Sequence, residues 1–320
     1  MGDCQLLLPA IPFVLYMEKM NLRKAYDEAL AEARNVNKNI VVLDADFSQA
    51  AEFALNAKIP FIEISTAGKT FEQIRSSIAI PKANVKIVDL SCNLSDQYVE
   101  DLNIIRAMPG MTVLNPVDAI ELKKMMSRII EYQGPVYLRI NRNDLPVCSS
   151  AGENFEIGKI YPLTDGKDMA IFATGFMVSK AMEAAHILNR EGLYAQVLNV
   201  STLKPLNRED VLKYAQWKKA VICAEESVKT GGLGQAIASI LLGKAACTFE
   251  LLAIDDVFGT PARDYDELLI HYGLSTEDIC NAARRLLQKK LGFFNISISG
   301  SEQKAIDKTL SIIQKITRKS

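Results

Sequence analysis

The sequence predicts an α/β fold with two tandem domains, each built on a mostly parallel sheet covered by helices. Short apolar runs rich in Val, Ile and Leu alternate with segments whose apolar residues recur every three or four positions. The strand candidates are apolar on both faces, which is typical of parallel strands with helices on each side. The alternation stops at a small, polar, aperiodic stretch and then restarts, so we expect a linker at 149–155. A chain of 320 residues is long enough for about two domains of ordinary size.

The first domain is expected at 20–148, after an irregular leader at 1–19. Pro9 and Pro12 interrupt the apolar runs of this leader and no basic residue precedes them, so it fits neither a secretory signal nor a membrane span. Asn21 can cap the first helix, in which Leu22 and Tyr26 begin an apolar stripe. The strand candidates that follow are 39–44, 85–88, 111–114 and 136–140, with helical patterns at 71–78 and 125–130 between them.

The second domain is expected at 156–291. Its strand candidates are 169–173, 195–200, 220–224 and 249–254. Ser275 with Asp278 three residues later resembles a capping box, which would open the last helix of the domain. Beyond Gly292, an amphipathic stripe in 302–317 predicts an extra helix within 292–320, and such a stripe is more typical of a docking helix than of a membrane contact.

Composition excludes several classes of protein. Hydrophobic residues make up 49% and charged residues 23%, as in a soluble globular protein. A formal net charge of −1 argues against a nucleic-acid-binding surface. Six cysteines are scattered without a close pair, and several lie in apolar runs. We therefore expect reduced core thiols in a cytoplasmic protein, and neither a disulfide framework nor a zinc site.

Charged residues follow two of the predicted strands. The strand at 39–44 ends in Asp44 and is followed by Asp46, which puts carboxylates at the carboxyl edge of a sheet, where open α/β folds bind their ligands. Arg142 closes the strand at 136–140, and its guanidinium could bind a phosphate or carboxylate bidentately. Pairing of Arg142 with Asp144 is the alternative.

Two further patterns are weaker. Gly231, Gly232 and Gly234 open a helical segment, and free amides at a helix start can hold a phosphate. Their spacing does not match the dinucleotide fingerprint, so close packing and a tight turn are favoured. His186 and His271 lie in helical stretches without a nearby serine, cysteine or carboxylate arrangement, which argues against a Ser-His-Asp hydrolase or a histidine metal site.

An ordered set of motifs is more specific. The set includes Val42-Leu43-Asp44-Ala45-Asp46, Arg106-Ala107-Met108-Pro109-Gly110-Met111-Thr112-Val113, Gly134-Pro135-Val136-Tyr137-Leu138-Arg139, Thr202-Leu203-Lys204-Pro205-Leu206 and Tyr272-Gly273-Leu274-Ser275. Over most of 20–290 it resembles the C-terminal section of transketolase, as found in split transketolases whose pyrimidine-binding and C-terminal domains form a separate subunit. The resemblance implies a shortened pyrimidine-binding domain at 20–148 and a transketolase C-terminal domain at 156–291.

This resemblance implies a cofactor and a partner. Family members transfer a ketol unit between sugar phosphates with thiamine diphosphate, which lies between two subunits. The diphosphate and magnesium are held by a pyrophosphate-binding domain, so an N-terminal transketolase subunit is the expected partner, in a homodimer or heterotetramer. Arg142 matches an arginine that contacts substrate phosphate. Asp46 matches an aspartate near the thiazolium ring, with Ser48 beside it as a second cofactor-proximal position.

The sequence departs from the family where the pyrimidine ring should bind. The family's catalytic glutamate lies in a Gly-Ile-Ala-Glu-Gln-like motif, which is absent between Ser48 and Lys58; Glu52 is the remaining carboxylate there and has no supporting motif. No aromatic residue follows Phe61 in the shortened stretch that should stack on the pyrimidine. Asp96 replaces a substrate-contacting histidine. We therefore assign no catalytic residue and no metal ligand, and we expect cofactor binding by this chain to be missing or grossly weakened.

Three interpretations remain open. The chain is a transketolase-like subunit with impaired catalysis, or it is a non-catalytic structural or regulatory paralogue that keeps the scaffold. A subunit for another thiamine reaction, like the beta subunits of 2-oxo-acid dehydrogenases, ranks last because those proteins also need the missing glutamate.

Overall fold

A computed structural model describes residues 18–288, except 66, 93, 95–97, 150, 151, 153 and 261–263. The leader predicted at 1–19 lies outside this range except for its last two residues. The extra helix predicted within 292–320 and the candidate residue Asp96 also lie outside the described residues. No helix in the described part of the chain is long and apolar enough to cross a membrane.

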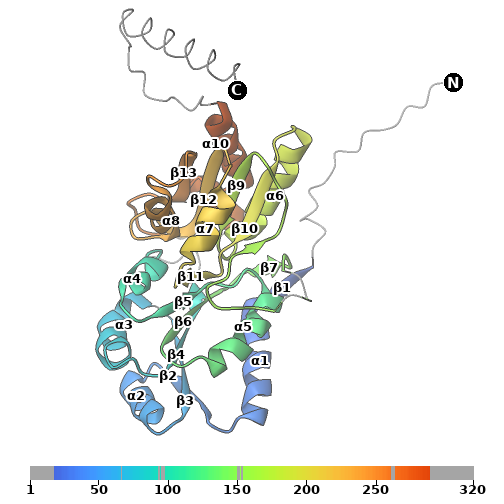
Figure 1. The fold of residues 1–320 in the computed structure, drawn as a ribbon. Coiled ribbons are helices and arrows are strands. Elements are labelled where there is room, and N and C mark those ends of the chain that lie inside the picture. Colours follow the sequence, from blue (N-terminus) through green and yellow to red (C-terminus); the bar gives the residue numbers. More distant parts are fainter. Residues whose placement is uncertain are drawn as a thin grey trace, which may run out of the picture. The chain divides into compact units, whose positions relative to one another are not determined.

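The first half of the chain builds a six-stranded sheet (Figure 1). In spatial order its strands are β11 (Thr202–Lys204), β5 (Thr112–Leu114), β6 (Val136–Asn141), β4 (Lys86–Cys92), β3 (Ile59–Ile64) and β2 (Ile40–Asp44). Neighbouring strands are parallel except for β11, which runs antiparallel to β5 and comes from the second half of the chain. A separate two-stranded ladder joins β1 (Lys19–Asn21) to β7 (Asp144–Pro146).

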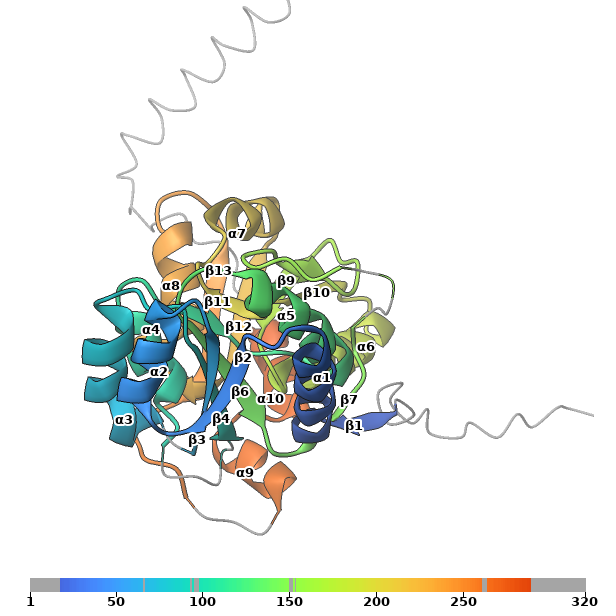
Figure 2. The same cartoon turned by 90° about the horizontal axis from the view of Figure 1, so that it is seen from below.

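Helices cover both faces of this sheet, as Figure 2 shows. One face carries α1 (Leu22–Val36) and α5 (Ala119–Glu131), and the other carries α2 (Phe47–Leu55), α3 (Ala67–Gln73) with its π-helical continuation η2 (Ile74–Ala79), and α4 (Asp101–Ala107). The strands between them are mostly apolar; β2 is partly exposed, and β4 and β6 carry the buried charged residues Lys86, Asp89 and Arg139. The predicted helix-covered, mostly parallel sheet is therefore confirmed for the first half.

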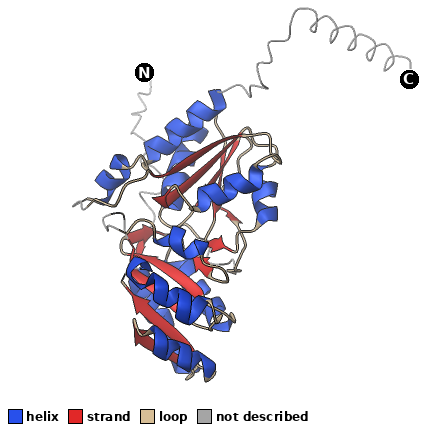
Figure 3. Cartoon of the chain, turned by 90° about the vertical axis from the view of Figure 1, so that its left-hand side faces the viewer, coloured by secondary structure: helices blue, strands red, loops and turns tan. Residues whose placement is uncertain are grey.

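The second half repeats the architecture with five strands. Their spatial order is β13 (Thr248–Ile254), β12 (Ala220–Val228), β9 (Met169–Ala173), β10 (Ala195–Asn199) and β8 (Tyr161–Pro162), and only the short β8 is antiparallel to its neighbour among these described strands. The helices are α6 (Met177–Arg190), α7 (Arg208–Ala215), α8 (Leu233–Leu241), α9 (Tyr265–His271) and α10 (Thr276–Gln288). Figure 3 shows helices on both sides of the strands in each half.

Local signals explain several of the helix starts. The side chain of Asn21 accepts a hydrogen bond from Lys24 N at 2.9 Å, as its position before the apolar stripe predicts. Asp278 Oδ2 accepts from Ser275 N at 3.0 Å while Ser275 Oγ accepts from Asp278 N at 3.2 Å, so the predicted capping box is formed. All eight predicted strands are present, with ends that differ by up to four residues.

Besides β11, the elements in and around the first sheet that were not predicted include β3 and α2. β3 contains Pro60, and a proline inside an apolar run usually argues against a strand. Here β3 begins to pair with β4 at Phe61, one residue after Pro60, so the missing amide removes no bond of that ladder. The second element is α2, whose nine residues occupy the segment that the sequence presents as a shortened connection. Its existence shows that β2 and β3 are joined by a helix even though the connection is short.

Candidate functional site

The turn after β2 brings two acidic residues to the carboxyl edge of the first sheet. Asp44 ends the strand, Ala45 adopts a left-handed backbone conformation (φ 49°), and α2 begins two residues later. Asp46 is the N-cap of α2, and its Oδ1 accepts a hydrogen bond from Gln49 N at 2.9 Å. Ser48 lies exposed in the first turn of the same helix. The structure thus places Asp46 and Ser48, two residues apart, at the sheet edge, with one Asp46 oxygen already used to cap the helix.

Arg142 lies at the same edge, directly after a strand that is not a neighbour of β2. It follows β6, is exposed, and its backbone N donates to Cys92 O at 3.3 Å. Asp144, the alternative partner considered from sequence, accepts a hydrogen bond from Asn21 Nδ2 at 2.8 Å. Since β4 and β3 separate β6 from β2, Arg142 and Asp46 are about three strand spacings apart, roughly 14 Å. A small ligand would not contact both side chains without further groups between them.

The described residues near this edge do not fit a pyrimidine ring. Phe47 and Phe61 are both buried in the core, so neither ring is available for stacking on a ligand. Glu63, near the end of β3, lies 3.3 Å from the Arg23 guanidinium. Glu52 is exposed on α2. The edge therefore offers exposed or already paired carboxylates, and no carboxylate buried beside a free aromatic face, so we derive no chemical step through thiamine diphosphate.

A buried polar network lies behind this edge, between β4, β6, α4 and β12. Arg139 Nε donates to Asp101 Oδ2 at 3.0 Å, and Arg139 Nη1 lies 3.6 Å from Glu226 Oε2. The Tyr137 hydroxyl lies 3.0 Å from both Asp89 Oδ2 and Asp101 Oδ2. A phenol carries one proton, so it can donate to one of these carboxylates at a time. Sequence reasoning missed this network because its members are far apart in the chain.

Burial controls the ionisation of this network. It raises the pKa of Glu226 to about 7, against the lowering effect of Arg139, and it raises the pKa of Tyr137 and of the Cys92 thiol well above their usual ranges. One guanidinium contacts two carboxyl groups, those of Asp101 and Glu226, and Asp101 Oδ1 and Glu226 Oε1 are buried without a hydrogen-bond partner. The network is thus rich in acceptors and favours retaining a proton on Glu226 near neutral pH.

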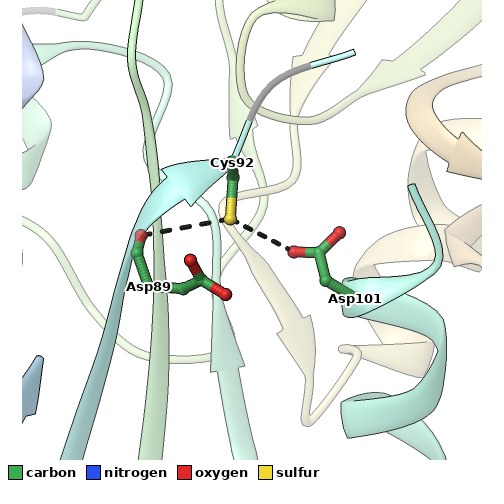
Figure 4. A group of neighbouring side chains, drawn as sticks. All are labelled: Asp89, Cys92 and Asp101. Carbon is green, nitrogen blue, oxygen red and sulfur yellow. Dashed lines mark hydrogen bonds between the residues drawn. The ribbon is translucent and has the colours of Figure 1, made fainter. Parts of the chain in front are cut away.

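Three members of the network have the side chains of metal ligands. One ligand atom from each of Asp89, Cys92 and Asp101 lies within 4.8 Å of the others, as Figure 4 shows. However, Cys92 Sγ donates to Asp101 Oδ2 at 3.5 Å, and the same oxygen accepts from Arg139. A divalent cation would have to displace these donors and lie against a guanidinium of like charge. The group fits an internal hydrogen-bond network better than a metal centre.

The glycine-rich segment also has an internal partner. Leu233 N and Gly234 N, at the start of α8, each donate to the buried carboxylate of Glu225 at 2.8 Å. A Cβ on Gly232 would lie 2.5 Å from Glu225 Oε1, and a Cβ on Gly234 would lie 2.1 Å from a Leu251 methyl carbon. The favoured interpretation of close packing is confirmed, since a carboxylate of the same chain already occupies the position that a bound phosphate would need.

Another buried glutamate, Glu121, joins the two halves of the chain. Glu121 on α5 accepts hydrogen bonds from Asn199 Nδ2 at 2.8 Å and from Ser201 Oγ at 2.5 Å. It borders a cavity of about 20 Å³, room for about one water molecule. Burial raises the pKa of Glu121 to about 7. His186 is partly exposed and His271 is exposed, as expected for helix histidines without a catalytic role.

Family comparisons match both halves of the chain. The family described as "Transketolase, pyrimidine binding domain" matches residues 61–147, and "Transketolase, C-terminal domain" matches residues 158–279. A putative transketolase C-terminal section of Methanocaldococcus jannaschii is 35% identical over 309 residues, which cover 84% of this chain and 96% of that protein. The 6-deoxy-6-sulfo-D-fructose transketolase subunit SqwH of Clostridium sp. (strain MSTE9) is 33% identical and covers 87% of this chain and 98% of its own.

Solved structures agree with these relatives. A structure titled "Split gene transketolase, inactive beta4 tetramer" superposes with a TM-score of 0.78 at 35% identity, covering 84% of this chain and 98% of that one. Transketolase from Campylobacter jejuni shares the fold, with a TM-score of 0.70 at 15% identity, and the match covers 47% of its chain. Human transketolase, at 27% identity, is likewise matched over 51% of its length. This chain therefore belongs to the transketolase family and corresponds to its C-terminal section, with a pyrimidine-binding and a C-terminal domain.

Proposed function

We propose that this chain acts as the C-terminal subunit of a split transketolase, whose family reaction is ketol transfer between sugar phosphates, and that its own half of the cofactor site is impaired. The match over nearly the whole length of relatives named as a transketolase subunit or C-terminal section supports the subunit role. In this proposal 20–148 is the shortened pyrimidine-binding domain, 149–155 the linker and 156–291 the C-terminal domain.

The partner in this proposal is an N-terminal transketolase subunit that brings the pyrophosphate-binding domain and with it the sites for diphosphate and magnesium. A homodimer or heterotetramer would place that domain against the carboxyl edge of the first sheet. Arg142 would hold substrate phosphate there, and the neighbourhood of Asp46 and Ser48 would face the cofactor. We propose a cytoplasmic location, because the cysteines of the described residues are free thiols. We propose no nucleic-acid or membrane partner.

The connection between β2 and β3 carries the proposal of impaired catalysis. β2 ends at Asp44, α2 runs from Phe47 to Leu55, and β3 starts at Ile59. The described chain therefore passes from strand to helix to strand without the glutamate motif on which the family depends, and the aromatic ring of Phe61 points into the core. A positioned acid–base group is commonly worth ~10²–10⁴-fold in rate, so its loss should be visible in turnover.

The test is ketol transfer from xylulose 5-phosphate by this chain co-expressed with a pyrophosphate-binding subunit, beside an intact split pair. We expect a rate lower by about two to four orders of magnitude. The variant Glu52→Gln should leave the residual rate unchanged, because this exposed carboxylate does not replace the missing glutamate. Turnover comparable with that of the intact pair would refute the proposal, and a large loss in Glu52→Gln would identify Glu52 as the substitute acid.

A non-catalytic structural or regulatory paralogue is the second candidate. The observation that favours it is the contrast between a well-packed scaffold and a cofactor edge whose described residues offer no free aromatic face. In that case the chain should assemble with the partner and should alter the activity of an intact C-terminal subunit when the two are mixed. A genome that encodes a second, intact C-terminal section would support this role.

A further inference from the structure

A hollow opens at the end of the second sheet where β12 and β13 begin, between the end of α7 and the segment that follows α8. Its volume of about 570 Å³ is within the usual range of small-molecule sites, about 300–1,000 Å³. It is lined by Glu209, Leu212, Lys213, Ala215, Gln216, Trp217, Lys218, Lys244, Ala245 and Ala246. We call it the Trp217 hollow.

Trp217 is the sole tryptophan of the chain and has an unusual setting. Its side chain is 89% exposed, and its backbone φ of 65° lies in the left-handed region that a bulky residue rarely adopts. Core packing does not account for a large apolar ring held in water in a strained backbone conformation. Strained residues of this kind gather at ligand-binding positions, and a flat exposed ring offers a stacking surface.

The charges that line the hollow are mostly positive. Three lysines, Lys213, Lys218 and Lys244, line it together with a single carboxylate, Glu209. Lys218 Nζ donates to Gly166 O, so this ammonium already has a partner outside the hollow. Lysines near helix ends also complement the helix dipole, which explains Lys213 in the last turn of α7 but does not explain the exposed tryptophan beside them.

We propose that the Trp217 hollow binds a nucleotide, whose flat base stacks on Trp217 and whose phosphates lie between Lys213 and Lys244. Ammonium groups form charge-assisted hydrogen bonds to phosphate, and an aromatic ring stacks on any base without reading its sequence. Both halves of this ligand are needed, because the lysines alone would attract any anion and the ring alone any flat molecule. The proposal does not depend on the proposed function.

Fluorescence of the single tryptophan tests the proposal on the full chain. We expect ADP to quench it saturably, and adenosine alone and inorganic pyrophosphate alone each to bind at least about tenfold more weakly. The double variant Lys213→Glu with Lys244→Glu should weaken ADP binding at least about tenfold. Lys38→Glu, the same kind of substitution at a single exposed lysine between α1 and β2, should have no effect.

Calorimetry with Trp217→Ala provides the second readout, because that variant has no tryptophan fluorescence; its affinity for ADP should also fall at least about tenfold. Absence of saturable quenching by ADP would overturn the proposal. Equal affinity for pyrophosphate and ADP would overturn the stacking role of Trp217. Unchanged ADP binding in the double lysine variant would show that the nucleotide binds elsewhere and would overturn the site.

Discussion

Replacing Arg139 by leucine should destabilise the protein strongly, because its guanidinium is the cation of the buried network. The Arg139 side chain is 2% exposed, contacts Asp101 from α4 and lies beside Glu226 from β12 of the second sheet. Removing one partner of a buried ion pair costs about 3–5 kcal/mol, since the remaining carboxylates stay buried and unpaired. At roughly 2–4 °C per kcal/mol, the melting temperature should fall by about 6–20 °C.

Urea unfolding followed by circular dichroism, together with calorimetric melting, would measure this loss. Arg142→Leu is the matched control: the same change three positions later in the chain, at an exposed arginine. Its free energy of unfolding should change by no more than about 0.5 kcal/mol. If Arg139→Leu costs no more than Arg142→Leu, the buried network contributes no stability and the reasoning is wrong.

The remaining predictions concern two titrations and one contact. Burial raises the pKa of Glu226 from 4.5 to about 7, so its contribution to stability is fully present below pH 4.5 and is lost as pH rises through 7. Glu226→Gln should flatten this pH dependence of the free energy of unfolding, measured from pH 4.5 to 8. Burial lowers the pKa of Lys86 from 10.5 to about 7, so its effect on stability has the opposite pH dependence. Between pH 7 and 10.5 the unfolded chain binds more protons than the folded one, and the free energy of unfolding therefore rises with pH. Lys86→Met should remove this slope, which is up to about 1.4 kcal/mol per pH unit. An unchanged slope in either variant would show that the side chain does not titrate as described. Gly234→Ala should cost about 1–3 kcal/mol by overpacking against Leu251, whereas Gly158→Ala, which meets no atom within 4 Å, tests the separate cost of a left-handed glycine; equal stability of Gly234→Ala and the parent protein would contradict the contact.

The sheets were predictable because their signals are local. An apolar run such as 169–173 and a cap such as Asn21 depend on residues next to one another, and both are found as expected. The strand β11 has no such signal, because Thr202–Lys204 becomes a strand by pairing with β5, almost ninety residues earlier. β3 was not predicted because its apolar run contains Pro60. The missing amide of a proline matters only if that position must donate to a neighbouring strand.

The candidate site was predictable only in part. The sequence placed Asp46 and Arg142 after strands of one sheet, and the structure has both at the carboxyl edge, but their separation depends on strand order, which no local pattern gives. Glu225 and Arg139 were not singled out for the same reason. Glu225 caps a helix that starts eight residues later, and Arg139 meets Glu226 across 87 residues of chain.

A crystal structure of the co-expressed pair with thiamine diphosphate and magnesium would test the central claim most directly, namely that this chain keeps the transketolase scaffold but lacks a working pyrimidine pocket. We expect no carboxylate of residues 18–148 within hydrogen-bond distance, about 3 Å, of the N1′ atom of the pyrimidine ring. A ring seated on this chain with such a carboxylate bonded to N1′ would contradict the claim.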